Sequence, residues 1–256
     1  MRHPEAAVAD ANAFGVAGGF DLTQLALGLQ IAASPNCGPR RGGVLPDMVV
    51  LHYTAMATAK AAIARMCDPQ SEVSAHYLIE RTGGLVRLVD EAQRAWHAGA
   101  GAWGGCSDVN SRSIGIELDN TGGHPFPEPQ MAALEALLAD IMRRRAIAPA
   151  RIIAHSDMAP ERKADPGARF DWRRLALCGL SVWPGRETGT QGGGAQAFAE
   201  AAARFGYSAD FAPDAVLSAF RQRFRPWQTG PLCAGDVADM TDLARRFPVD
   251  RPADNA

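Results

Sequence analysis

Residues 48–53 read Met-Val-Val-Leu-His-Tyr, and residues 113–118 read Ser-Ile-Gly-Ile-Glu-Leu. Each stretch is largely apolar and has the length of a buried β-strand. Segments with the spacing of helices lie between and beyond them, so that strands and helices are mixed along this part of the chain. A mixed order of this kind indicates an α/β domain.

Outward from these strands, residues 57–67 predict a short helix, and residues 151–154 predict a short strand that leads into His155. Residues 76–80 and 85–89 flank Arg81-Thr82-Gly83-Gly84 and predict a hairpin. Residues 129–145 predict a helix, whose basic end suits the negative end of the helix dipole. The apolar residues at helical spacing in it are Met131, Leu134, Leu137, Leu138 and Ile141. We therefore expect a central mixed β-sheet flanked by helices.

The chain divides into a body and a tail. Residues 1–46 are mostly irregular, and the glycine-rich stretch 185–194 is typical of a flexible linker. Beyond the linker, residues 195–205, 213–224 and 237–247 predict three short helices. We expect an N-terminal extension over 1–33, a main domain over 34–184, the linker over 185–194 and a small helical domain over 195–250.

Composition excludes several classes of function. Hydrophobic residues make up 47% and charged residues 21%, which is ordinary for a globular protein. A net charge of −2 gives no reason to expect binding to nucleic acid, which usually needs a basic face, and no apolar run is long enough to span a bilayer. Five widely spread cysteines and an N-terminus interrupted by Glu5 and Asp10 favour a cytoplasmic protein, with a periplasmic one as the alternative. The oligomeric state is left open.

Three separated residues carry the chemistry of a metal site. His52 lies near the end of one predicted strand, His155 follows another, and Asp165 comes ten residues later. Two imidazoles and one carboxylate are a set that suits a catalytic zinc with its fourth position open to water. From position alone, a histidine after a strand is more often a packed residue than a ligand.

Five segments in order raise that expectation. They are Val49–Thr54, Ser74–Ile79, Trp96–Gly99, Ser113–Leu118 and His155–Gly167. Together they resemble the type 2 N-acetylmuramoyl-L-alanine amidases, a family that includes phage amidases and the peptidoglycan recognition proteins. The resemblance covers about residues 34–176, so that the main domain is expected to be the catalytic one.

The resemblance implies a role for each residue of the motifs. His52, His155 and Asp165 match the zinc ligands, Glu117 matches the general base, and Lys163 matches the residue that stabilises the oxyanion. Because all five are present, the family implies an active enzyme that hydrolyses the amide bond between N-acetylmuramic acid, or its anhydro form, and L-alanine. Its partners would be peptidoglycan fragments or muropeptides.

Other polar residues have two interpretations each. His97 is expected to line the substrate groove, Arg162 either binds a stem-peptide carboxylate or is solvated, and Asn120 either contacts substrate or ends its strand. Asp157 is an alternative ligand, but two residues from His155 it is more simply a residue that caps a turn.

Two further alternatives stay open at this point. The tail resembles the three-helix peptidoglycan-binding-like domain attached to some of these amidases, or it is a packing appendage of the main domain. The protein as a whole is either a zinc amidase or a non-catalytic peptidoglycan-recognition module. A generic metallopeptidase is more distant, because the sequence has no H-E-x-x-H helix.

Overall fold

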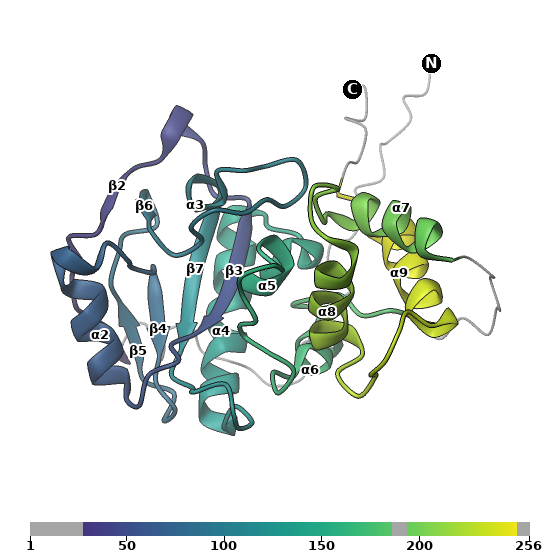
Figure 1. Ribbon diagram of the computed structural model, residues 1–256. Helices are drawn as coiled ribbons and strands as arrows, with labels where there is room; N and C mark the ends of the chain where they lie inside the picture. The colour runs from purple at the N-terminus through teal and green to yellow at the C-terminus, as the bar shows by residue number, and fades with distance from the viewer. Residues whose placement is uncertain (1–27, 186–193, 250–256) are drawn as a thin grey trace, which may run out of the picture.

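The computed structural model describes residues 28–185 and 194–249 (Figure 1). Its main sheet contains the strands β1 (Leu29–Ile31), β3 (Met48–Tyr53), β4 (Tyr77–Ile79), β5 (Leu85–Arg87), β7 (Ser113–Leu118) and β8 (Ile152–Ala154). The strand order is β1-β5-β4-β7-β3-β8. A separate antiparallel pair consists of β2 (Cys37–Pro39) and β6 (Gln93–Ala95).

The main sheet is mixed, as the sequence predicted. Strand β3 runs parallel to both β7 and β8, and β4 runs parallel to β7. Strands β4 and β5 form the predicted antiparallel hairpin. Strand β1 was not predicted; it pairs in parallel with β5 at one edge of the sheet, and three residues are too few to show a period of two in the sequence.

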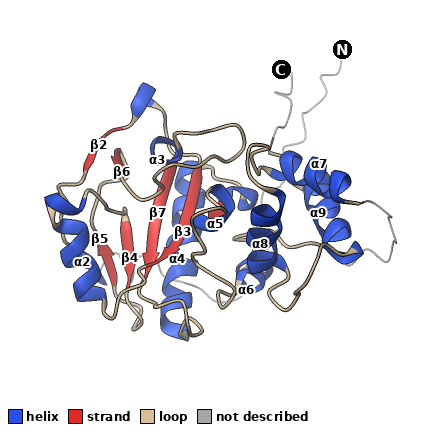
Figure 2. Cartoon of the chain, viewed as in Figure 1, coloured by secondary structure: helices blue, strands red, loops and turns tan. Residues whose placement is uncertain are grey.

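The helices are shown in blue in Figure 2. They are α2 (Ala59–Cys67), α3 (Val109–Arg112), α4 (Glu128–Arg145), α5 (His155–Met158), α6 (Trp172–Leu177), α7 (Ala195–Phe205), α8 (Pro213–Phe224) and α9 (Ala234–Arg246). In Figure 2, α7 and α9 lie beyond α8 on the side away from the sheet. Three 3-10 turns also occur, at η1 (Arg41–Gly43), η2 (Pro69–Ser71) and η3 (Pro149–Arg151).

Alternation along β3 assigns the two faces of the sheet. Val49 and Leu51 share a core with the apolar side of α4, whereas Met48 and Val50 share a core with the C-terminal helices. Since side chains alternate along a strand, His52 lies on the face of Met48 and Val50, opposite α4. Helix α2 covers the β4–β5 part of the sheet, where its apolar residues pack against Leu78.

The tail forms the three expected helices. Helices α7 and α8 have the predicted bounds, and α9 begins at Ala234 instead of Val237. The Asp236 carboxylate accepts a hydrogen bond from the Cys233 amide at 3.0 Å, which caps a turn that lies before the first apolar residue.

These helices and one face of the sheet bury a single hydrophobic cluster. It includes Val50 and Ile153 of the sheet together with Phe220 of α8 and Met240 of α9. The expected extension (1–33) lies mostly, and the expected linker (185–194) almost entirely, outside the described residues. The proposed domain boundaries therefore remain predictions.

Candidate active site

The polar residues of the site begin with two neighbouring strands. In the parallel pair β3–β7, His52 lies directly beside Glu117. Residues opposite each other in register point to the same face, so the imidazole and the carboxyl group stand side by side on the sheet. This face of the sheet is the one opposite α4. The apolar side chains Val49 and Leu51 of β3 point to the α4 side, and His52 points away from it.

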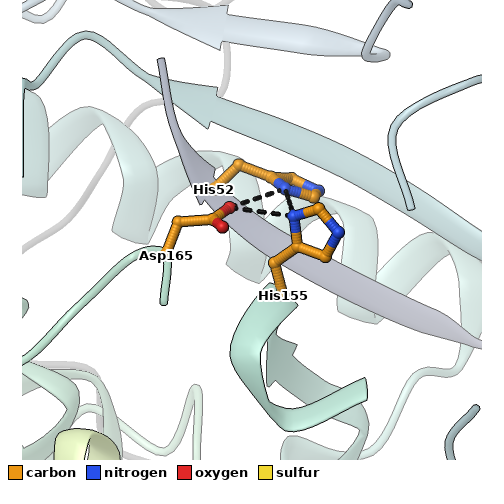
Figure 3. Close-up of side chains that lie close together, drawn as sticks. All are labelled: His52, His155 and Asp165. Carbon is orange, nitrogen blue, oxygen red and sulfur yellow. Dashed lines mark hydrogen bonds and ion pairs between the residues drawn. The ribbon is translucent and has the colours of Figure 1, made fainter. Parts of the chain in front are cut away.

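His155 and Asp165 complete a cluster with His52, and the three side chains point toward one another (Figure 3). His155 is the first residue of α5, directly after β8, and Asp165 lies in the following loop. The Ser156 amide donates to the Asp165 carbonyl at 3.0 Å, which ties the loop to the start of α5. Asp165 Oδ2 lies 3.0 Å from Nδ1 of His52 and 3.0 Å from Nδ1 of His155.

The donor set fits a metal ion. His155 Nε2 lies 3.0 Å from the Ala98 carbonyl, which can only accept, so Nε2 carries the hydrogen and Nδ1 keeps its lone pair. That Nδ1 faces His52 Nδ1 at 2.9 Å and the Asp165 carboxylate. When His52 Nδ1 also lacks a hydrogen, these two nitrogens and the Asp165 oxygen form a buried set of lone pairs that suits a cation.

Burial sets the charge state of the groups in this cluster. Burial, and after it the neighbouring His155, lowers the pKa of His52 to about 4, so that its imidazole is neutral and able to act as a ligand near neutral pH. Burial, and after it the charge of Asp165, raises the pKa of Glu117 to about 8, with Lys163 opposing the shift. Within the described part of the chain, no group donates a hydrogen bond to Glu117 Oε2.

A cavity of about 480 Å³ opens at the cluster. His52, His155, Asp165, Glu117 and Lys163 all contribute to its lining, so that the structure brings together the five residues singled out from the sequence. Helix α2 forms another part of the wall. The lining from α2 and its preceding loop consists of Thr54, Ala55, Met56, Ala62, Arg65 and Met66.

The three predicted substrate-contacting residues have different surroundings. His97 and Arg162 line the cavity. The Arg162 guanidinium donates to the backbone carbonyls of Ala98 and Ala100, so part of its donor set is already in use. Asn120 is buried and does not line the cavity. Its side chain accepts from the Gly122 amide at 2.7 Å, an arrangement that stabilises the turn after β7 and supports the strand-ending interpretation.

Asp157 lies outside the metal-ligand cluster. It is buried and accepts hydrogen bonds from the Tyr207 hydroxyl at 2.7 Å and from the Arg223 guanidinium. It also accepts from the Ala154 amide, which caps the start of α5 as the simpler interpretation predicts. Its carboxylate therefore joins the helix that carries His155 to the C-terminal helices.

Sequence reasoning did not single out Ser113 or the carbonyl of Ala98. Ser113 Oγ lies 3.1 Å from His97 Nε2, and it occupies the same face of β7 as Gly115 and Glu117. The alternation of side chains along residues 113–118 could have predicted that Ser113 lies on the same face as Glu117. The role of Ala98 has no sequence signal, because it depends on a backbone carbonyl.

Comparison with known proteins identifies the family of the chain. A sequence model of the family described as N-acetylmuramoyl-L-alanine amidase matches residues 42–168, the segment that carries all five residues. The N-acetylmuramoyl-L-alanine amidase AmiD of Escherichia coli K12 is 39% identical in an alignment of 212 positions, which covers 70% of this chain and 75% of that protein. The chain belongs to the N-acetylmuramoyl-L-alanine amidase family.

Two further amidases extend the comparison. The 1,6-anhydro-N-acetylmuramyl-L-alanine amidase AmpD of Escherichia coli K12 is 32% identical over 59% of this chain and 92% of its own. A solved complex of E. coli AmiD with the substrate anhydro-N-acetylmuramic acid-L-Ala-D-gamma-Glu-L-Lys has a TM-score of 0.72 and 33% identity, covering 82% of this chain and 93% of that one. The family predicted from the sequence and its mixed α/β fold are confirmed, and the chain is an enzyme of the amidase class.

Proposed function

We propose that this amidase is zinc-dependent and hydrolyses the amide bond between N-acetylmuramic acid, or its anhydro form, and the L-alanine of the stem peptide. One observation carries the proposal. His52, His155 and Asp165 place three ligand atoms around one point, and Glu117 lies beside them with an unpartnered oxygen in the same cavity.

Zinc suits two imidazoles and one carboxylate, and when bound it supplies Lewis acidity that polarises a carbonyl and makes water easier to deprotonate. His52, His155 and Asp165 would hold it. Both histidines present Nδ1 to the site, and burial excludes bulk water from these ligand atoms. A fixed, buried donor set of this kind favours binding because little is left to reorganise.

Glu117 is proposed as the general base and then the general acid. Its carboxylate takes a proton from the water whose oxygen attacks the amide carbonyl carbon. The C–N bond then breaks, and the same proton passes to the departing L-alanine nitrogen, so that the carboxylate is regenerated. Burial raises the pKa of Glu117 above that of an ordinary carboxyl group, which makes the protonated side chain long-lived enough to return the proton to the nitrogen.

Lys163 is proposed to stabilise the negative charge on the carbonyl oxygen during the attack. It lines the cavity two residues before Asp165, and no described residue is recorded in an ion pair with its ammonium group. An unpaired cation in this place is available to a developing oxyanion, where one such donor typically contributes about 3 kcal/mol.

The substrate class is proposed from the relatives. AmpD is named for the anhydro-sugar bond, and AmiD has been solved with an anhydro-muropeptide. His97 and Arg162, which line the cavity, are the residues proposed to lie against such a ligand. Incubation with purified anhydro-muropeptide and with intact sacculi, followed by separation of the products, tests this. Release of a peptide that begins with L-alanine supports the proposal, and binding without release favours the recognition-module alternative.

The proposal for the tail is that it completes the core of the main domain. The cluster that α7, α8 and α9 share with β3 and β8 supports the packing alternative over a separate glycan-binding domain. The proposed compartment is the cytoplasm, supported by five free cysteines. Cell fractionation tests it. None of the described helices is both long and apolar enough to cross a membrane.

A further inference from the structure

We propose that His97 and Ser113 are positioning residues that fix the tautomer of the zinc ligand His52. The inference rests on the proposed function, because it concerns how the protein prepares a ligand for zinc. It differs from the expectation that His97 only lines the substrate groove. A chain of hydrogen bonds runs from the Val109 carbonyl through Ser113 and His97 to His52.

The first link fixes the hydroxyl of Ser113. Its Oγ lies 2.6 Å from the Val109 carbonyl oxygen, which has no hydrogen to give. A distance of this length is that of an O–H···O hydrogen bond, so the hydroxyl hydrogen points at Val109. Ser113 has one hydroxyl hydrogen, and toward its other neighbour it therefore acts as an acceptor.

The second link fixes His97. Its Nε2 lies 3.1 Å from Ser113 Oγ and must donate, because Oγ accepts there. A neutral imidazole carries one hydrogen, so His97 Nδ1 keeps a lone pair. That Nδ1 lies 3.0 Å from His52 Nε2, which must in turn donate.

The chain ends at the metal site. With its hydrogen on Nε2, His52 presents a bare Nδ1 to His155 and Asp165. Nitrogen binds a metal through that lone pair, and the partner of the opposite ring nitrogen sets which lone pair is free. The same rule acts on His155 through the Ala98 carbonyl. Both histidines are thus held in the tautomer that a metal at Nδ1 requires.

The fold makes a place for His97. Gly115 lies under its ring, and a Cβ at that position would overlap the ring atoms. The Asn110 carboxamide oxygen accepts from the amides of both His97 and Ala98, at 3.0 and 2.8 Å. The Asn110 side chain therefore holds the backbone of residues 97 and 98 in place. This backbone carries His97, whose Nδ1 is the acceptor for His52, and the Ala98 carbonyl, which is the acceptor for His155. Glycine in the middle of β7 is explained by the close approach of His97.

The test uses the full chain with three variants. His97→Ala removes the atom that accepts the hydrogen bond from His52 Nε2. His97→Asn places an amide oxygen, which is also an acceptor, where His97 Nδ1 lies. Ser113→Ala removes the hydroxyl and frees His97 to move its hydrogen. The half-buried His124, outside the cavity, supplies a matched control as His124→Asn. Two quantities are measured: zinc affinity by competition with a chelator, and the tautomer of His52 from imidazole ¹⁵N shifts in zinc-free protein at mildly alkaline pH.

We expect the His52 hydrogen on Nε2 in the unaltered protein and a mixture of tautomers in His97→Ala. Zinc affinity should fall about 10–100-fold in His97→Ala, which is the usual effect of losing such a partner, and should recover in His97→Asn. Ser113→Ala should show a smaller loss, and it carries the test if His97→Ala does not fold.

Three results would overturn the inference. They are a His52 hydrogen on Nδ1 in the unaltered protein, zinc affinity that is unchanged in His97→Ala, and His97→Asn binding as weakly as His97→Ala. Failure of the proposed function has a different signature, because an unaltered protein that binds no zinc would reject the metal site while the tautomer of His52 is still measured.

Discussion

Glu117 and His52 lie side by side because residues 65 positions apart share a register in the parallel strands β3 and β7. The sequence predicts both strands and, through the family resemblance, both roles. It also contains the parity that places Ser113, Gly115 and Glu117 on one face. It does not predict that His97 lies over that face, because the position depends on the path of a loop and on a missing Cβ at Gly115.

Glu117→Gln should abolish most turnover while leaving the metal in place. The amide keeps the shape of the side chain but cannot accept the proton of the attacking water, and general-base losses are commonly about 10²–10⁴-fold in kcat. Zinc stoichiometry and peptide release are measured on the same preparation. Glu200→Gln, at an exposed position on α7, is the control. Turnover at the unaltered rate by a Glu117→Gln protein with normal zinc content would reject the proposed base.

Lys163→Ala should lower kcat about 10²–10³-fold, because one donor to the developing oxyanion is lost. Its effect on KM should be small, since the interaction strengthens mainly in the transition state. The chain has one other lysine, Lys60, which is exposed on α2, so that Lys60→Ala is a matched control in the same kinetic assay. A change confined to KM would assign Lys163 to substrate binding instead.

At the scale of elements, the C-terminal end of α4 shows how much a local rule misses. The basic run 143–145 was interpreted as a complement to the helix dipole. In the structure, Arg144 and Arg145 both pair with the buried carboxylate of Glu91, at 2.8 Å each. The Tyr77 hydroxyl of β4 donates to the same carboxylate at 2.8 Å. The sequence could not show this, because Glu91 lies 53 residues before Arg144.

This network predicts an acid-dependent loss of stability. Burial alone would raise the pKa of Glu91, but hydrogen bonds from Arg144, Tyr77 and Arg145 outweigh it and lower the pKa from 4.5 to about 2. A pKa that folding depresses contributes stability above the unfolded value, and the contribution is lost as the pH falls from about 4.5 toward about 2. Glu91→Gln should therefore be less stable than the unaltered protein near neutral pH.

The difference in unfolding free energy between Glu91→Gln and the unaltered protein should shrink as the pH falls. Urea unfolding at a series of pH values from about 6 to about 3 measures it, because the glutamine variant lacks the proton uptake of Glu91 on unfolding. Glu128→Gln, where the carboxylate is at the surface, is the control and should follow the unaltered protein closely. A difference in unfolding free energy that stays constant over this pH range would contradict the assignment of the depressed pKa to Glu91.

At the scale of the whole molecule, the sequence predicts the C-terminal helices but leaves open whether they form a separate domain or pack on the main one, and the structure packs them into the core beside β3. The amphipathic spacing of α7 and α8 shows that each helix buries one face. It does not show which part of the molecule that face packs against. A buried ion pair between Arg223 of α8 and Asp157 of α5 joins the C-terminal helices to the main domain. The Arg223 guanidinium also donates to the Ile152 carbonyl at 2.9 Å. Arg223 also stacks on the Trp172 ring at 4.3 Å.

Arg223→Met should destabilise the whole protein by about 3–5 kcal/mol, because it leaves the Asp157 carboxylate buried without its cation. Unfolding should stay a single transition, since the tail and the sheet share one core. Arg173→Met, at an exposed position on α6, is the matched control and should change stability by less than about 0.5 kcal/mol. Calorimetry measures both quantities. Two separate transitions in the unaltered protein would show that the tail folds on its own.

The central claim is that His52, His155 and Asp165 hold the zinc on which hydrolysis depends. The direct measurement is release of the L-alanine-terminated peptide from anhydro-muropeptide by protein stripped of metal, before and after zinc is returned, with Asp165→Ala treated identically. The stripped protein should release no peptide, one equivalent of zinc should restore release, and Asp165→Ala should not recover. Release at the full rate by stripped protein, or recovery in Asp165→Ala, would show that these three residues do not hold a catalytic zinc.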